Sequence, residues 1–178
     1  MPDEVVGVFS YGRVVGRLAE ALGTWCVTTA SVEVADEVAR LLGGVPQPWN
    51  LGGRECLEVV SDTQSVRIVI AGARSITFQG AGCRGLLGME AERARAMSGM
   101  GFGPDVVITF SLAKRLSLGL FRFQARSWNF LESAVAVEAS LASTGVMVEC
   151  ELALKRTEFK GECGVRALYW APCMRVIA

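Results

Sequence analysis

The chain repeats one order of segments, and this order constrains its fold more than any other feature of the sequence. Each copy starts with a strand-like run, continues through a serine into a helical stretch that ends at glycine, and closes with two further strand-like runs. In the helical stretches apolar side chains recur at i, i+4 and i+7, whereas β-branched and aromatic residues fill the strand-like runs. The sequence therefore predicts the order β-α-β-β twice.

The first copy lies in residues 23–70, and the turn-rich segment 46–53 precedes its closing hairpin. Its elements, in order, are a strand over 23–29, a capping Ser31, a helical face of Val34, Val38 and Leu41, a stop at Gly43 and Gly44, and a hairpin of 56–60 with 65–70. A serine at this position supplies an acceptor for the free N–H groups of the first helical turn, and glycine adopts the backbone angles that end a helix.

The second copy lies in residues 120–170. Its elements, in order, are a strand over 120–124, a capping Ser127, a helical face of Phe130, Ala134, Val137 and Leu141, a stop at Gly145, and paired runs over 146–154 and 165–170. No residue identity links the two copies, so β-α-β-β as a common local arrangement is the alternative to a true repeat.

These patterns predict an α+β protein made of two β-α-β-β units, with a mainly antiparallel sheet and one main helix in each. The predicted organisation is an N-terminal lobe over 1–79, a Gly/Met-rich connector over 80–103 and a C-terminal lobe over 104–178, packed tightly enough to count as one domain. The connector has two interpretations: a simple link, or an adaptable binding edge built from flexible methionines.

The charge balance points to a protein partner. Lys and Arg number 18, as do Asp and Glu, so the formal net charge is zero. Proteins that bind nucleic acid alone draw their affinity from a surplus of basic side chains, which this chain lacks as a whole. We therefore expect little or no independent DNA binding. A balanced total charge is still compatible with a local basic patch.

Histidine is absent, and this excludes several kinds of chemistry. Cys-His and Ser-His nucleophile pairs, His-ligated zinc and the usual general base near neutral pH all require it. The six cysteines contain no CxxC pair, and Cys83 lacks an activating partner. The segment 80–85 has the letters GxGxxG, but it lacks the following helix and the acidic residue that a nucleotide-binding site needs. Asp36 and Glu37 could form an acid/base pair, but we expect them on the solvent side of the first helix. We expect no catalytic residue, no cofactor and no metal.

A polar row on the strand over 120–124 is the best candidate for a binding surface. Arg122, Gln124 and Arg126 alternate along one side of the chain and lead into Trp128. Arginine and tryptophan are the residues most enriched at interface hot spots. The sequence therefore predicts partner binding by these four residues, with a solvent-facing sheet edge as the alternative.

Several short segments of the sequence resemble those of the actinophage-type recombination directionality factors. The first block comprises 25–29, 34–44, 46–49 and 57–60, the second comprises 118–123 and 127–129, and the tail comprises 152–160 and 169–172. The resemblance extends over about 120 of the 178 residues, in the family's order. The family's middle stretch is longer and holds a cysteine cluster suited to zinc, whereas Cys83 is the only cysteine between the blocks here, so metal binding does not carry over.

The resemblance implies a regulator without an active site. Such a protein binds the coiled-coil region of a phage serine integrase seated on att-site DNA, and it switches recombination from integration (attP × attB) to excision (attL × attR). It implies a location in the bacterial cytoplasm, which agrees with the acidic start of the chain and the lack of an apolar run of membrane-spanning length. The alternatives are a phage structural or assembly protein, recognisable by self-association, and an enzyme that uses facing carboxylates alone.

Overall fold

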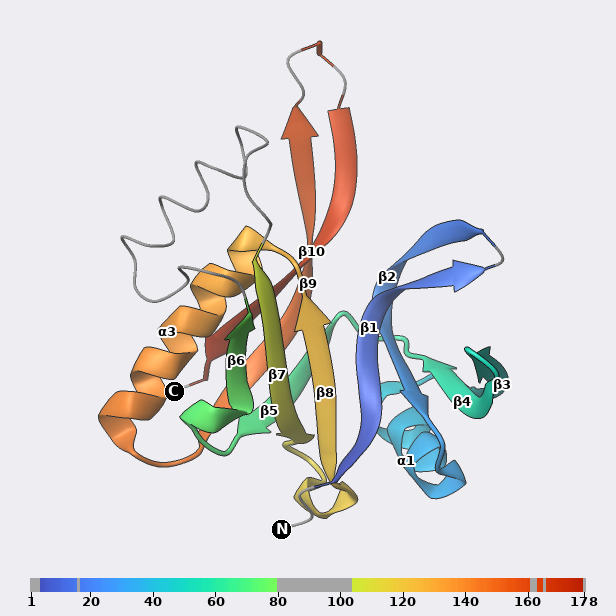
Figure 1. The fold of residues 1–178 in the computed structure, drawn as a ribbon, viewed down its shortest axis with the longest axis horizontal. Helices are drawn as coiled ribbons and strands as arrows, with labels where there is room; N and C mark the ends of the chain where they lie inside the picture. The colour runs from blue at the N-terminus through green and yellow to red at the C-terminus, as the bar shows by residue number, and fades with distance from the viewer. Residues whose placement is uncertain (1–3, 16, 80–103, 161–162, 165, 178) are drawn as a thin grey trace.

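A computed structural model describes residues 4–15, 17–79, 104–160, 163–164 and 166–177. Within these residues the chain forms ten strands and two α-helices (Figure 1). The strands are β1 (Val5–Val15), β2 (Leu18–Thr29), β3 (Pro46–Leu51), β4 (Arg54–Val60), β5 (Ser65–Ile70), β6 (Ile76–Gln79), β7 (Asp105–Leu112), β8 (Leu120–Ala125), β9 (Val148–Lys160) and β10 (Arg166–Val176). The helices are α1 (Val32–Leu42) and α3 (Trp128–Thr144). None of the helices described is long and apolar enough to cross a membrane.

All ten strands belong to one mixed sheet. Its order is β10-β9-β5-β7-β8-β1-β2-β4-β3, and β6 pairs with β7 beside this path. The pair β1–β8 is parallel, whereas the other pairs are antiparallel. Strands from both halves of the chain interleave, because β5 lies between β7 and β9 while β8 lies beside β1. Both predicted lobes thus contribute to the same sheet.

The sheet curls around its core because β4 runs almost directly into β5. These two strands stand far apart in the strand order, yet only residues 61–64 connect them. The connection stays hydrogen-bonded: Trp25 N–H donates to the Thr63 carbonyl, Ser61 N–H donates to the Trp25 carbonyl, and Leu154 N–H donates to the Gln64 carbonyl. The bend brings β2 into contact with β9 and β10 on the concave side.

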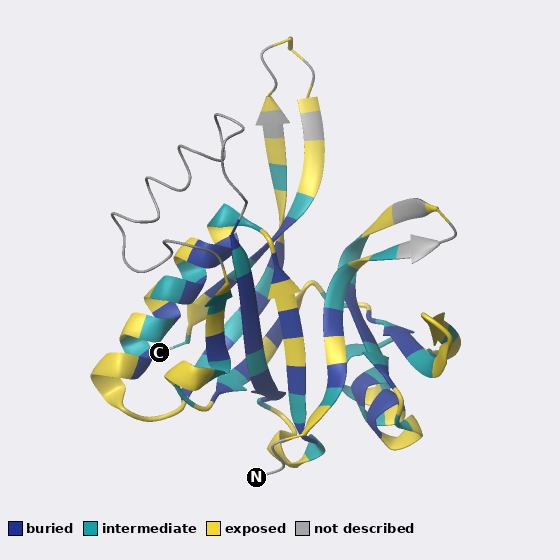
Figure 2. Ribbon diagram, viewed as in Figure 1, coloured by how far each residue is buried: buried dark blue, intermediate teal, exposed yellow. Residues whose placement is uncertain are grey.

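Aromatic rings fill the concave side of the sheet. The fully or nearly fully buried rings are those of Phe9, Trp25, Phe110, Phe121, Phe123 and Phe130. Phe123 occupies the centre of this cluster, with its ring centroid 5.1 Å from that of Trp25 and 5.2 Å from that of Phe130, both edge to face. Such pairs add about 0.5–1.5 kcal/mol each to the burial of apolar area. Figure 2 shows buried positions along the central strands of the sheet.

Both helices were located correctly by the sequence patterns. Ser31 caps α1, and its hydroxyl accepts from Val34 N–H; Ser127 caps α3 in the same way and accepts from Phe130 N–H. Gly145, in a left-handed conformation, ends α3. Helix α1 covers β2 and β4, and α3 packs against β10 and β7.

The predicted architecture of two β-α-β-β units is wrong. The protein is mostly β, with one large mixed sheet in place of two small ones. The runs 56–60 and 65–70, predicted as a hairpin, are indeed strands, but β4 pairs with β2 and β3 while β5 pairs with β7 and β9. The physical reason is that side-chain periodicity specifies which face of a strand is buried, but not which strand lies beside it.

Candidate protein-interaction groove

Within the predicted polar row, Arg122 and Gln124 lie on the convex face of the sheet along β8, and Arg126 follows the end of this strand. Arg122, Gln124 and Arg126 are exposed and alternate with the buried side chains of Phe121, Phe123 and Ala125. Arg122 sits between Val8 of β1 and Thr109 of β7 in the strand register. The Gln124 amide donates to both carboxylate oxygens of Asp105, at 2.8 and 2.9 Å, so its side chain is held by its own sheet.

Trp128 turns away from this face into a groove at the start of α3. We call this the arm-base groove, because it lies where the β9–β10 hairpin leaves the body of the protein. Its volume is about 400 Å³. The lining residues come from β1, the start of α3 and β10: Tyr11, Arg126, Ser127, Trp128, Asn129, Tyr169, Trp170, Ala171 and Pro172. The predicted residues therefore divide between two places, with Arg122 and Gln124 outside the groove and Arg126 and Trp128 inside it.

Packing fixes the aromatic walls of the arm-base groove. Trp170 lies so close to β2 that a Cβ atom added to Gly23 would come within 3.1 Å of its ring. The Tyr11 ring stands edge to face with Trp25, at 6.3 Å between centroids. Met174 N–H donates to the Ser133 hydroxyl at 3.1 Å, which ties β10 to α3 below the groove. The walls are thus largely preformed.

The chemistry of the groove suits a protein ligand. Arg126 is the one charged residue among the nine that line it, and four of the others are Tyr or Trp. Burial raises the pKa of the Tyr11 phenol above its ordinary 10.0, so this group stays a neutral hydrogen-bonding hydroxyl. Aromatic walls with polar edges can hold an apolar side chain, and an exposed guanidinium can donate two parallel hydrogen bonds to a carboxylate.

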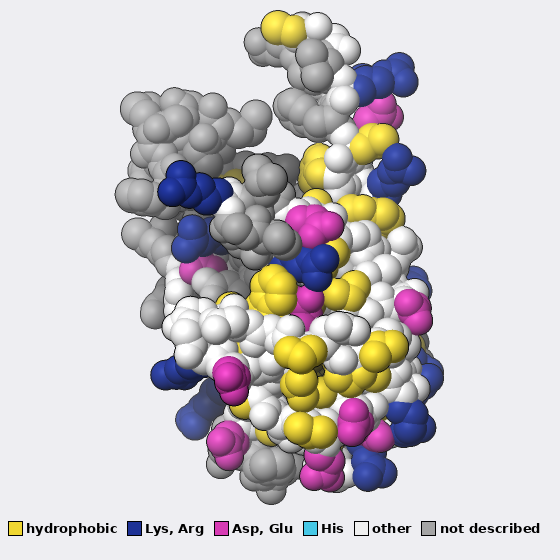
Figure 3. Space-filling view, turned by 90° about the vertical axis from the view of Figure 1, so that its right-hand side faces the viewer, with side chains coloured by type: hydrophobic (Ala, Val, Ile, Leu, Met, Phe, Trp, Pro, Cys, Tyr) yellow, Lys and Arg dark blue, Asp and Glu magenta, His cyan; other side chains and the backbone are white. Residues whose placement is uncertain are grey.

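A second hollow lies between the start of α1 and the β3–β4 hairpin. Its volume is about 550 Å³; Val32, Trp49 and Leu57 belong to its apolar lining, and Glu55 is its charged residue. Figure 3 faces this side of the molecule and shows hydrophobic side chains gathered on it. The charged residue in its lining is thus an acid, whereas that of the arm-base groove is a base.

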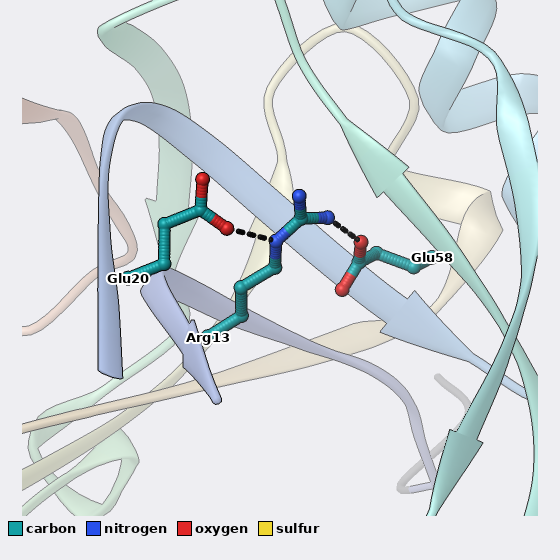
Figure 4. A network of polar contacts seen from close by, with 3 residues as sticks. All are labelled: Arg13, Glu20 and Glu58. Carbon is teal, nitrogen blue, oxygen red and sulfur yellow. Dashed lines mark hydrogen bonds and ion pairs between the residues drawn. The ribbon is translucent and has the colours of Figure 1, made fainter. Parts of the chain in front are cut away.

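An ion-pair network beside this hollow anchors the β1–β2 hairpin. The Arg13 guanidinium donates to Glu20 and to Glu58, at 2.8 Å in each case (Figure 4). It also lies 5.9 Å from the ring centroid of Trp49. The Glu58 side chain is only 5% exposed, and no buried side-chain nitrogen or oxygen within the described part of the chain lacks a hydrogen bond. The network thus satisfies a buried carboxylate and joins β1 to β4.

The two carboxylates of α1 singled out in the sequence differ in their surroundings, and cations hold Glu37. Asp36 is exposed, as expected. Glu37 lies 2.6 Å from Arg40 and 3.8 Å from Arg115. The hydrogen bond from Arg40 lowers the pKa of Glu37 below its ordinary 4.5, so this carboxylate remains ionised near neutral pH. An acid held in this state is a poor proton donor.

The cysteines described by the structure are free; Cys26 and Cys150 are buried, whereas Cys163 is exposed. Burial raises the pKa of Cys26 to about 12 and that of Cys150 to about 11, which keeps both thiols protonated at neutral pH. No three His, Cys, Asp or Glu side chains in the described ranges gather closely enough to hold a metal ion. Cys83, the GxGxxG-like segment 80–85 and the Gly/Met-rich connector 80–103 lie outside the described residues.

Of the nine residues that line the arm-base groove, the sequence predicts a binding role for two, Arg126 and Trp128. Tyr169, Trp170, Ala171 and Pro172 stood out in the sequence as part of the tail block, but not as binding residues. Tyr11 gave no signal, because its strand was not predicted. Comparison with known protein families, with curated proteins and with solved structures gives no match to this chain.

Proposed function

We propose that this protein is a recombination directionality factor, which binds a serine integrase and switches recombination from attP × attB to attL × attR. One observation carries the proposal. Residues 127–129 from the second block of the family resemblance and residues 169–172 from its tail, about 40 positions apart in the chain, line the same groove. A single binding surface would explain why this chain resembles the family in both blocks.

The chemistry of the groove fits the partner that the resemblance implies. A coiled coil presents apolar seam residues bordered by charged side chains at its flanking positions. The aromatic walls formed by Tyr11, Trp128 and Trp170 suit the apolar residues, and Arg126 suits a flanking carboxylate. The zero net charge of the chain agrees with a factor that reaches DNA through its partner.

The switch requires a difference in affinity. A ligand shifts an equilibrium between two integrase arrangements only as far as it binds one of them more tightly. Reversing a 99:1 preference requires about a 10⁴-fold difference, which corresponds to about 5.5 kcal/mol. Aromatic anchors supply that difference where their contacts form in one integrase arrangement and not in the other, because truncating a single hot-spot residue costs about 2 kcal/mol or more.

Recombination in vitro with the cognate serine integrase tests the proposal. We expect the protein to promote attL × attR recombination and to inhibit attP × attB recombination, in proportion to its binding to integrase. If neither reaction changes when the protein is present at saturating concentration, the proposal is wrong. A sizing column run in parallel separates this function from that of an assembly protein, which would form large homo-oligomers.

Two matched variants locate the contact. Arg122→Glu and Arg126→Glu make the same charge change at exposed positions four residues apart, one on the convex face of β8 and one in the arm-base groove. We expect Arg126→Glu to weaken integrase binding at least tenfold and Arg122→Glu to have the smaller effect. The reverse order would move the contact to the convex face of the sheet.

A further inference from the structure

The end of the β9–β10 hairpin projects from the body of the protein. Strand β9 pairs with β5 only as far as Ala153, and beyond that point its one strand neighbour is β10. The projecting part, residues 155–160 and 166–170, is called the β9–β10 arm here; it rises from the sheet at the top of Figure 1. Most of its described side chains are exposed.

One face of this arm concentrates basic side chains. Arg166 lies directly opposite Lys160 in the strand register, and Arg156 lies opposite Trp170, so the three cations share a face. Glu158 is the acid on this face, and it lies 3.4 Å from Arg166. Lys and Arg side chains stand out along the projecting hairpin at the top of Figure 3. A chain with zero net charge therefore carries a local positive surface.

The arrangement of these cations favours an extended anion. Like charges directly opposite on neighbouring strands repel one another. Glu158 pairs with Arg166 and offsets one of the two facing cations, so a further anion beside Lys160 and Arg166 relieves the unfavourable contact that remains. Arg156 and Lys160 are four residues apart on the same strand face, a spacing of about 13 Å. A single carboxylate cannot bridge this span, whereas the phosphates along a DNA strand can meet both positions. A two-stranded ribbon also has dimensions that fit against the grooves of duplex DNA.

We propose that the β9–β10 arm contacts the phosphate backbone of duplex DNA through Arg156, Lys160 and Arg166 while the arm-base groove holds the integrase. This inference rests on the proposed function, which seats the protein on an integrase already bound to DNA. Phosphate contacts of this kind position a protein without reading sequence. The arm thus adds affinity for DNA-bound integrase over free integrase.

The size of this contribution follows from the number of phosphates. Each neutralised phosphate contributes about −0.9 to the slope of log K against log salt, so three contacts give a slope of about −2.7. Between about 50 and 200 mM salt the arm's contribution then falls about 40-fold. Three contacts are too few for strong binding to DNA alone, in agreement with the balanced charge of the whole chain.

The test measures the affinity of the protein for free integrase and for integrase on an attL duplex, at several salt concentrations from about 50 to 200 mM. The variant Arg156→Gln/Lys160→Gln removes two of the three cations and leaves Arg166 with Glu158. The matched control Arg74→Gln/Lys114→Gln makes the same charge change at exposed positions outside the arm. Thermal melts confirm that each variant is folded.

We expect wild type and control to bind DNA-bound integrase more tightly than free integrase, by a ratio that falls with salt. In the arm variant this ratio should drop and its salt slope should decrease by about two. An unchanged ratio in the arm variant overturns the inference. An equal loss of affinity for free integrase also overturns it, because the arm would then contact integrase and not DNA.

A parallel titration of a fluorescent duplex without integrase, at about 20 mM salt, separates the two proposals. If wild type binds no integrase but binds the duplex, and the arm variant does not, the phosphate contact stands and the directionality-factor proposal fails. If wild type binds neither, both fail.

Discussion

Gly44, which connects α1 to β3, is expected to be among the least replaceable residues of the chain. Its φ is +89°, and a Cβ atom added there would lie 2.1 Å from the Val60 carbonyl oxygen, where real Cβ atoms keep at least 3.0 Å. Gly53, in the β3–β4 turn, is the matched control, because its φ is +86° and a Cβ atom there meets nothing within 4 Å. Both alanine variants share the backbone strain, and only Gly44→Ala adds the clash.

The backbone term is about 1–2 kcal/mol for each variant. Relieving the clash at Gly44 displaces the backbone of β4 at Val60, which pairs with Cys26 of β2. It also disturbs the hydrogen bond that Gly44 N–H donates to the Asp62 carboxylate. Overpacking of this kind costs about 1–3 kcal/mol, and a lost hydrogen bond adds about 1 kcal/mol. We therefore expect Gly44→Ala to lower the free energy of unfolding by about 2–4 kcal/mol more than Gly53→Ala.

Urea unfolding followed by tryptophan fluorescence measures this difference, since Trp25 is fully buried in the native state. Equal slopes of free energy against urea are required for the comparison. If the two variants differ by less than about 1 kcal/mol, the close approach of Gly44 to β4 is not a feature of the folded protein in solution.

Three further outcomes follow from the structure. Ser31→Ala removes the α1 cap and should cost about 1 kcal/mol by urea unfolding, whereas Ser31→Asp, which keeps an acceptor, should cost less. Iodoacetamide at neutral pH should label the exposed Cys163 in the folded protein. Burial raises the pKa of Cys26 to about 12, so this thiol should react only after unfolding. Equal labelling of the two thiols in the folded protein, measured by mass spectrometry, would contradict the burial of Cys26. The hydrogen bond from the Ser65 hydroxyl lowers the pKa of the Glu151 carboxylate below its ordinary 4.5. The stabilisation that this carboxylate gives is therefore complete above pH 4.5 and is lost as the pH falls through its folded-state pKa. Glu151→Gln should flatten this part of the curve of stability against pH, measured by thermal melts.

Local signals in the sequence located the helices well. Ser31 and Ser127 cap α1 and α3, and apolar spacing identified their buried faces. Alternation along β8 correctly separated exposed Arg122 from buried Phe121 and Phe123. These features depend on neighbours a few residues away, and such neighbours are visible in a single sequence.

Features that depend on distant partners could not be predicted. The segment 46–53 has the composition of a turn, but residues 46–51 form β3, which ends the strand order and, among the described strands, pairs with β4 alone. Proline is tolerated on such an edge, where one side of the backbone needs no ladder partner. Likewise, nothing near Tyr11 indicates that Trp128 and Trp170 line the same groove. The arm-base groove exists only once three separate segments have packed together.

The parallel pairing of β1 with β8 has a consequence for biosynthesis. Val8 lies beside Arg122, which follows it by about 110 residues. At about 5–20 residues per second, a ribosome exposes β1 roughly 5–20 s before its neighbour exists. During that time the β1–β2 hairpin presents one open edge and the apolar face of Phe9 and Trp25. Nascent chains of this protein should therefore depend on chaperones that shield apolar hairpins, and slower translation upstream of β8 should increase aggregation in the cell.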